Sequence, residues 1–128
     1  MMKTTHFGLL AGLLGMAMSA GVLADMEGEA VYSDNCLACH QAGGEGISGV
    51  FPALHDNTFV SGDADDVVRV LLNGRGGMPS FNGDLSSEQI ASVTNFLRTH
   101  FNDAAGGIDV QYVDSLRTSD ASTMEREE

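Results

Sequence analysis

Apolar residues recur at helical spacing in two segments of the chain. The two stripes are formed by Val67, Val70 and Leu71, and by Ile90, Val93, Phe96 and Leu97. Asp63 provides an N-cap for the first helix, and Asn73-Gly74 ends it. Ser86 precedes the second helix and forms a capping box with Gln89. Both segments therefore predict amphipathic helices with defined starts.

Two shorter helices are expected nearer the ends of the chain. Residues 25–35 predict one helix, with Gly28 and Tyr32 on the same face, and residues 110–116 predict another. Glycine-rich loops lie at 41–50 and 75–83, and no segment indicates a strand. The pattern predicts an all-α domain in which long loops wrap something.

The N-terminus has the organisation of a secretory signal peptide over residues 1–24. Lys3 lies in a short polar region, an apolar run follows from Phe7 to Met18, and Val22-Leu23-Ala24 has the small side chains that signal peptidase needs. We expect cleavage after Ala24 and a periplasmic location; the alternative is an uncleaved membrane anchor. The remaining chain is expected to form a domain over 25–117 and a disordered acidic tail over 118–128.

Charge and cysteine content exclude several classes of protein. The chain has 128 residues, with 18 Asp and Glu against 6 Lys and Arg, and a net charge of −12. Nucleic acids and anionic membrane surfaces need clustered basic side chains, so neither is expected as a partner. Two cysteines are too few for a disulfide scaffold or a four-cysteine zinc site.

Candidate chemistry is concentrated in Cys36-Leu37-Ala38-Cys39-His40, a CxxCH motif. This spacing suits covalent attachment of haem c, since two thiols one helical turn apart can form thioethers with the two vinyl groups. The adjacent imidazole of His40 can then bind the iron axially. A CxxC redox pair expects a βαβ context, and half a zinc site expects a second ligand pair; the sequence shows neither.

Met78 is the expected second axial ligand of the iron. It lies in Gly76-Gly77-Met78-Pro79, a stiffened loop, and thioether sulfur favours ferrous iron. The alternative for this methionine is gap-filling in the core. His55 and His100 are the competing ligands, although each is also explained as an edge or surface histidine.

From Gly28 to about Phe101 the chain resembles class I c-type cytochromes, which are small monohaem electron-transfer proteins. The matching features are CxxCH at 36–40, Gly28 with Tyr32, Phe51-Pro52-Ala53-Leu54, Asn73-Gly74-Arg75 before Met78-Pro79, and Val93 with Phe96. The segment from Phe101 to Arg117 is similar, less specifically, to cytochrome subunits that accept electrons from periplasmic dehydrogenases.

The resemblance implies a cytochrome c-like fold around one haem and adds two site residues. The carbonyl of Pro52 is expected to accept a hydrogen bond from His40, which would fix the imidazole tautomer. Arg75 is expected either to pair with a haem propionate or to be a solvated loop charge. The chain departs from mitochondrial cytochromes c because it lacks their ring of lysines.

Together these features predict a periplasmic single-electron carrier, not an enzyme, that cycles iron between Fe(II) and Fe(III). Its redox partners are expected to present basic patches, although the acidity can also be explained by solubility. One alternative is a dedicated electron-accepting subunit of a periplasmic dehydrogenase complex. Another is a haem peroxidase or gas sensor with an open sixth site. The expected state is a monomer or a subunit of a larger complex, with membrane contact only if the N-terminal segment stays uncleaved.

Overall fold

A computed structural model describes residues 20–126 and contains six α-helices in that range. They are α1 (Ala20–Asn35), α2 (Leu37–His40), α3 (Thr58–Ser61), α4 (Ala64–Asn73), α5 (Ser87–His100) and α6 (Val110–Arg126). Only two isolated β-bridges accompany them there, which confirms the all-α expectation. None of these helices combines the length and the apolar character that crossing a membrane requires.

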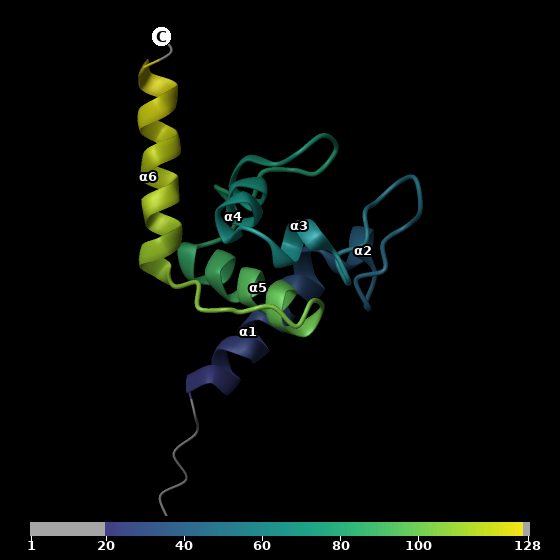
Figure 1. The fold of residues 1–128 in the computed structure, drawn as a ribbon. Helices are drawn as coiled ribbons and strands as arrows, with labels where there is room; N and C mark the ends of the chain where they lie inside the picture. Colours follow the sequence, from purple (N-terminus) through teal and green to yellow (C-terminus); the bar gives the residue numbers. More distant parts are fainter. Residues whose placement is uncertain (1–19, 127–128) are drawn as a thin grey trace, which may run out of the picture.

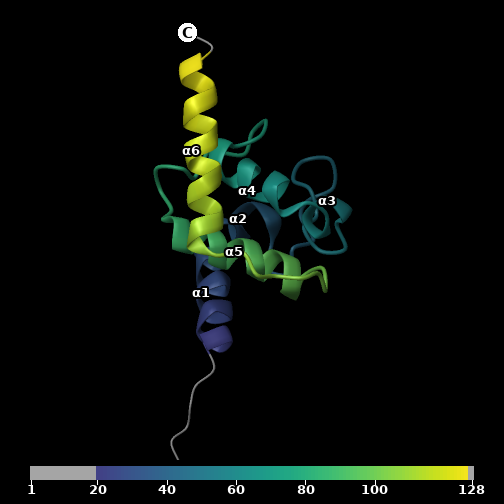
Figure 2. The same cartoon turned by 60° about the vertical axis from the view of Figure 1, so that its left-hand side comes forward.

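The central contact of the fold is the crossing of α1 with α5, visible below the centre of both ribbon views (Figures 1 and 2). Gly28 allows the close approach, because a Cβ at this position would lie 2.4 Å from the carbonyl oxygen of Ser92. Next to it, Tyr32 packs against Phe96 and Phe101 with ring centroids 5.6 and 5.2 Å apart. The Gly28–Tyr32 face thus forms one side of the core.

Helices α4 and α5 begin as their sequences predict. The carboxylate of Asp63 accepts a hydrogen bond from the Asp65 amide at 3.0 Å. Ser86 and Gln89 form the reciprocal capping box, with bonds of 3.1 and 3.0 Å. The α5 stripe and Leu71 of the α4 stripe are buried in one cluster that α6 joins through Val113 and Leu116. Val67 is also buried, whereas Val70 is half-buried.

Helix α6 differs from expectation in its length. The expected helix ended at 116 and was followed by a disordered tail over 118–128, whereas α6 continues to Arg126. The carboxylate of Asp120 accepts hydrogen bonds from Arg69 and Asn73 on α4, which holds this segment to the body. Residues 118–126 are therefore helical in the structure, in contrast to the expected tail, and residues 127–128 lie outside the described part.

At the other end, the expected signal peptide falls mostly outside the described residues, which begin at position 20. Residues 20–24 form the first turns of α1, so the helix starts five residues before the expected Asp25. Cleavage of the signal peptide after Ala24 stays a prediction.

Arg98 is a buried cation that joins three segments of the fold. Its guanidinium donates to the carbonyl oxygens of Val60, Gly62 and Ala105 at 2.9, 2.8 and 2.8 Å. These bonds fix α3 and the segment before α6 against α5. α3, a single turn capped by Asn57, was not predicted from the sequence pattern.

Candidate functional site

The two cysteines and the histidine of the CxxCH motif lie on one short turn of helix. Cys36 is the N-cap of α2 and its amide donates to the Tyr32 carbonyl at 2.8 Å, so α2 follows directly from α1. The His40 amide donates to the Cys36 carbonyl at 2.9 Å, which closes the turn. Cys36 and His40 are buried and Cys39 is exposed. The turn thus presents one interior thiol and one surface thiol.

The loop after α2 folds back to orient the His40 ring. Nδ1 of His40 lies 2.9 Å from the carbonyl oxygen of Pro52. A carbonyl oxygen only accepts, so Nδ1 carries the proton and Nε2 of the neutral ring is left with its lone pair for a metal. Gly46 makes the fold-back possible: its φ is +63°, and a Cβ there would lie 2.4 Å from the carbonyl oxygen of Phe51. The geometry therefore presents His40 as a preoriented ligand.

Both thiols are free, since the structure joins neither Cys36 nor Cys39 in a disulfide. Burial, with a smaller contribution from Cys39, raises the pKa of the Cys36 thiol to about 11. Cys36 is accordingly a neutral thiol at physiological pH.

Met78 lies in the loop of residues 74–86, here called the Met78 loop, between α4 and α5. Met78 and Arg75 exchange backbone hydrogen bonds of 3.0 and 3.1 Å, which makes a tight turn. Gly74 has a φ of +74°, and a Cβ there would lie 2.6 Å from the Met78 carbonyl oxygen. The half-buried Met78 side chain packs against the core. A loop this constrained holds its thioether in a fixed place.

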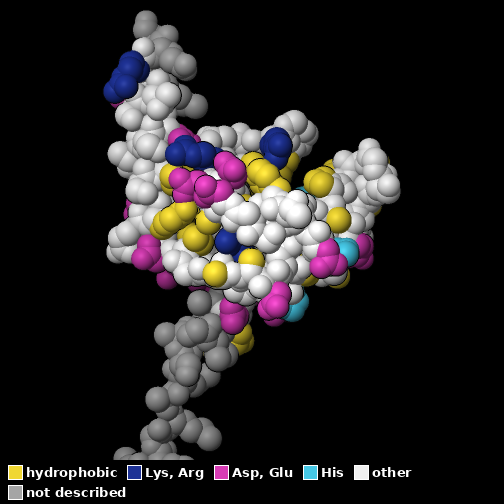
Figure 3. Space-filling view, viewed as in Figure 1, with side chains coloured by type: hydrophobic (Ala, Val, Ile, Leu, Met, Phe, Trp, Pro, Cys, Tyr) yellow, Lys and Arg dark blue, Asp and Glu magenta, His cyan; other side chains and the backbone are white. Residues whose placement is uncertain are grey.

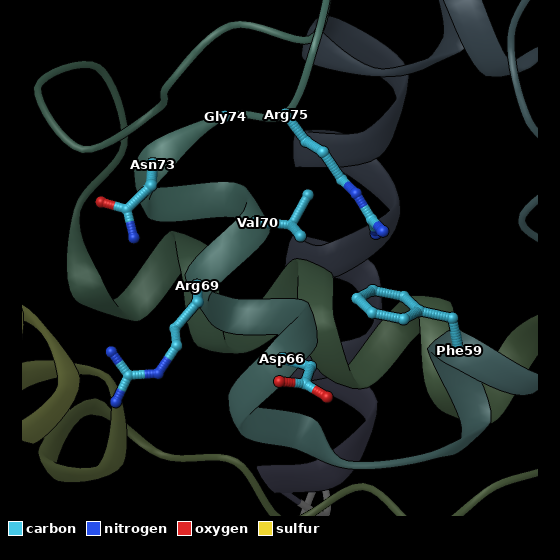
Figure 4. A pocket seen from close by; sticks show the side chains of 7 residues that line it. All are labelled: Phe59, Asp66, Arg69, Val70, Asn73, Gly74 and Arg75. Carbon is cyan, nitrogen blue, oxygen red and sulfur yellow. The ribbon is translucent and has the colours of Figure 1, made fainter.

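Arg75 lies beside a pocket of about 380 Å³ between α3, α4 and the start of the Met78 loop (Figure 4). Its guanidinium carbon is 5.0 Å from the centre of the Phe59 ring. In Figure 4 Arg75 points toward Phe59, whereas Arg69 extends away from α4 on the opposite side. The contact with Phe59 was not expected; the propionate contact of Arg75 stays a prediction.

The competing histidines make contacts of their own at or near the surface. Nδ1 of His55 lies 3.2 Å from the Asp56 carboxylate, and His100 stacks on Phe96 with ring centroids 4.7 Å apart. Met26 is exposed on α1, and the side chain of Met124 lies outside the described part. The structure therefore brings Cys36, Cys39, His40 and Pro52 together and places Met78 and Arg75 on the second loop.

The donor set and its surroundings fit a covalently bound haem. In Figure 1 the Met78 loop projects above α3 and the loop after α2 projects to its right. The space-filling view shows a notch on this side of the molecule with hydrophobic side chains at its edges (Figure 3). Large apolar side chains exposed on these segments are Leu37, Ile47, Val50 and Phe59. An apolar macrocycle would cover such side chains, which otherwise face water.

An all-helical domain with paired thiols, a preoriented imidazole and a thioether loop belongs to the class of monohaem c-type cytochromes. A family model described as "Cytochrome C oxidase, cbb3-type, subunit III" matches residues 24–97, and the chain belongs to this family. It is a cytochrome c electron-transfer protein, and its two cysteines are consistent with a single haem c.

Relatives and a solved structure support this membership. Cytochrome c6 of Leptolyngbya boryana is 40% identical over 73 residues, which cover 55% of this chain and 85% of that protein. The crystal structure of cytochrome c6 from the diatom Phaeodactylum tricornutum matches with a TM-score of 0.53 and 28% identity, covering 62% of this chain and 95% of the other.

A second group of relatives consists of subunits of larger enzymes. The cytochrome c subunit of the quinone alcohol dehydrogenase of Gluconacetobacter polyoxogenes is 31% identical over 117 residues, covering 81% of this chain. The present chain spans only 25% of that relative's length.

Proposed function

We propose that this chain is a periplasmic single-electron carrier whose haem c is attached through Cys36 and Cys39, with His40 and Met78 as axial ligands. The observation that carries the proposal is the His40 ring, buried one residue after the second thiol and oriented by the Pro52 carbonyl. Carbonyl-anchored imidazoles of this kind are ordinary metal ligands.

Met78 is the favoured second ligand because its loop is held in place and its side chain packs against the core. The Arg75–Met78 turn and Gly74 fix the loop backbone, whereas the His55 side chain is 42% exposed and His100 is exposed at the end of α5. Histidine–methionine ligation fills both axial positions and is the pattern of electron-transfer haems.

Bound haem c supplies an iron that changes by one electron between its ferrous and ferric states. His40 and Met78 would hold the iron, and the apolar side chains of Leu37, Ile47, Val50 and Phe59 would exclude water from it, so that little would reorganise on transfer. The Nδ1–H group of His40 donates to the Pro52 carbonyl oxygen, and this bond fixes the orientation of the ring.

The periplasmic location rests on the signal-like segment over residues 1–24 and on the haem attachment motif. N-terminal sequencing of protein from a periplasmic fraction would begin at Asp25. An uncleaved N-terminus in the membrane fraction would replace this proposal with an anchored carrier.

A second candidate is a dedicated subunit of a dehydrogenase assembly. The alignment with the alcohol dehydrogenase cytochrome c subunit covers 81% of this chain, more than the cytochrome c6 alignment does. Co-purification with a larger enzyme, stable to high salt, would favour the subunit over a free shuttle.

The axial assignment is tested with Met78→Ala, using the exposed Met26→Ala as a matched control. Loss of the thioether is expected to abolish the far-red sulfur-to-iron band and to let the reduced protein bind carbon monoxide. The reduction potential should fall by on the order of 0.1 V, a fraction of the ~0.8 V range that axial ligands span. Visible spectra and a redox titration measure all three effects.

Met26→Ala should behave as wild type. An unchanged reduction potential in Met78→Ala, with no far-red band in either protein, would move the sixth ligand to another residue, with His55 first. Ready binding of carbon monoxide by the wild-type protein would instead favour the peroxidase or gas-sensor alternative.

A further inference from the structure

Helix α6 lies beyond the part of the chain that defines the family. The family match ends at residue 97, and α6 covers Val110–Arg126. Yet α6 is firmly docked, because Val113 is fully buried and Leu116 is 7% exposed. α6 is therefore an additional helix that follows the matched segment and docks against it.

Arg117 makes the most extensive polar contact of α6, and it reaches the Met78 loop. Its Nη1 donates to the carbonyl oxygen of Asn82 at 2.7 Å and also to the Asn82 side-chain oxygen. Its Nη2 donates to the Leu85 carbonyl at 2.8 Å, and its Nε donates to the Ser87 hydroxyl at 3.0 Å. One guanidinium thus spans the end of the Met78 loop and the start of α5.

The Met78 loop is held from two directions. Helix α4 anchors the middle of the loop, because the Ser80 hydroxyl donates to the Leu72 carbonyl and the Phe81 amide donates to the Leu71 carbonyl. Helix α6 contacts the end of the loop, where Arg117 binds the segment from Asn82 to Leu85. Leu85 is buried in the core, and the Asp84 and Leu85 amides donate to the Phe81 carbonyl. Arg117 adds the side-chain contact that ties the exposed Asn82 to α6.

We propose that Arg117 is a positioning residue that, from α6, keeps the Met78 loop closed and thereby keeps Met78 on the iron. The proposal rests on the assignment of Met78 as an axial ligand. The guanidinium suits the task because its planar fork binds diverging acceptors at once, which an ammonium does not do.

The test uses the full haem-loaded protein and compares Arg117→Ala with Arg126→Ala, a matched change of the same residue type in the same helix. Arg126 is exposed and makes no hydrogen bond to the loop within the described residues. Imidazole, an external ligand that displaces a weakly held methionine, is titrated into the oxidised protein. Loss of the far-red sulfur band reports the displacement.

Arg117→Ala is expected to lower the imidazole concentration at half-displacement about tenfold, equivalent to ~1.4 kcal/mol. Arg126→Ala should match wild type. Arg117→Lys should resemble Arg117→Ala, because a point charge does not replace the fork. If Arg117→Ala does not fold, Asn82→Ala removes one acceptor and should give a smaller shift in the same direction.

Displacement by imidazole at the wild-type concentration in Arg117→Ala would overturn the proposal even if its melting temperature fell, because Arg117 would then only stabilise the fold. A wild-type protein that lacks the far-red band would contradict the Met78 assignment itself. The two failures are thereby distinguished.

Discussion

At Gly28 the absence of one methyl group decides how closely two helices approach. A Cβ at this position would lie 2.4 Å from the Ser92 carbonyl oxygen and 2.7 Å from the Phe96 Cβ. Both neighbours belong to α5, whose backbone has no flexible end that could move aside. Because Tyr32 and Phe96 pack beside the crossing, widening it would loosen the core next to Cys36.

Gly28→Ala is therefore expected to destabilise the protein despite its better helix propensity. Alanine gains ~1 kcal/mol in a helix interior, whereas overpacking of a tight contact costs ~1–3 kcal/mol or more. We expect the melting temperature to fall by ~4–8 °C for each net kcal/mol lost. The exposed neighbour change Glu29→Ala serves as control. An equal or higher melting temperature for Gly28→Ala would contradict the tight crossing.

At the scale of elements, the sequence predicted the helices whose signals are local. α4 and α5 were predicted well because an N-cap and an apolar stripe coincide within a few residues. The second half of α6 was missed because Thr118 to Arg126 carries no apolar stripe. Its support comes from Arg69 and Asn73, which bind Asp120 from 51 and 47 residues away.

In the candidate site, too, contacts between residues close in sequence were predicted and contacts between distant residues were not. The CxxCH motif and the Pro52 turn lie within 12 residues of one another, and their contact was expected from the resemblance. The contact of Arg117 with Asn82 spans 35 residues, and Phe59 meets Arg75 only through the packing of α3 on α4. Contacts that depend on where two helices meet have no local signature in the sequence.

Tyr112 makes the docking of α6 sensitive to alkaline pH. Its hydroxyl donates to the Asp65 carboxylate on α4, and this bond, with burial and the charges of Asp65 and Asp63, raises the pKa of Tyr112 from 10.0 to about 12. Tyr112→Phe removes the bond and is expected to lower the free energy of unfolding at pH 7 by ~1–2 kcal/mol.

A raised pKa means that folding favours the protonated phenol. The stabilisation is complete below pH 10, where the unfolded chain also keeps its proton, and is lost as pH rises toward about 12. Denaturant titrations should show a constant difference between wild type and Tyr112→Phe up to pH 10, which shrinks above it. A difference independent of pH would contradict the bond to Asp65.

For the whole molecule, charge is the dominant property. The 18 acidic side chains outnumber the 6 basic ones, and one of the basic ones, Arg98, is buried. A strongly negative surface attracts basic partners over a range set by the screening length, which falls from ~30 Å at 0.01 M salt to ~8 Å at 0.15 M.

Electron exchange with a lysine-rich cytochrome is accordingly expected to slow by on the order of tenfold between these two ionic strengths. Stopped-flow absorbance measures the second-order rate constant. Reduction by an uncharged small molecule provides the control and should be nearly independent of salt. If the second-order rate constant with the protein partner did not change with ionic strength, the acidity would serve solubility alone.

The end of α6 has a practical consequence for experiments on surfaces. The side chains of Ala121, Ser122, Thr123, Glu125 and Arg126 are exposed, and the helix projects beyond the body at the C-terminal end (Figure 2). An α-helix rises ~1.5 Å per residue and is stiff over such a length. A linker joined at position 126 would hold the domain on an electrode in one orientation, so that direct voltammetry would sample a single face of the protein.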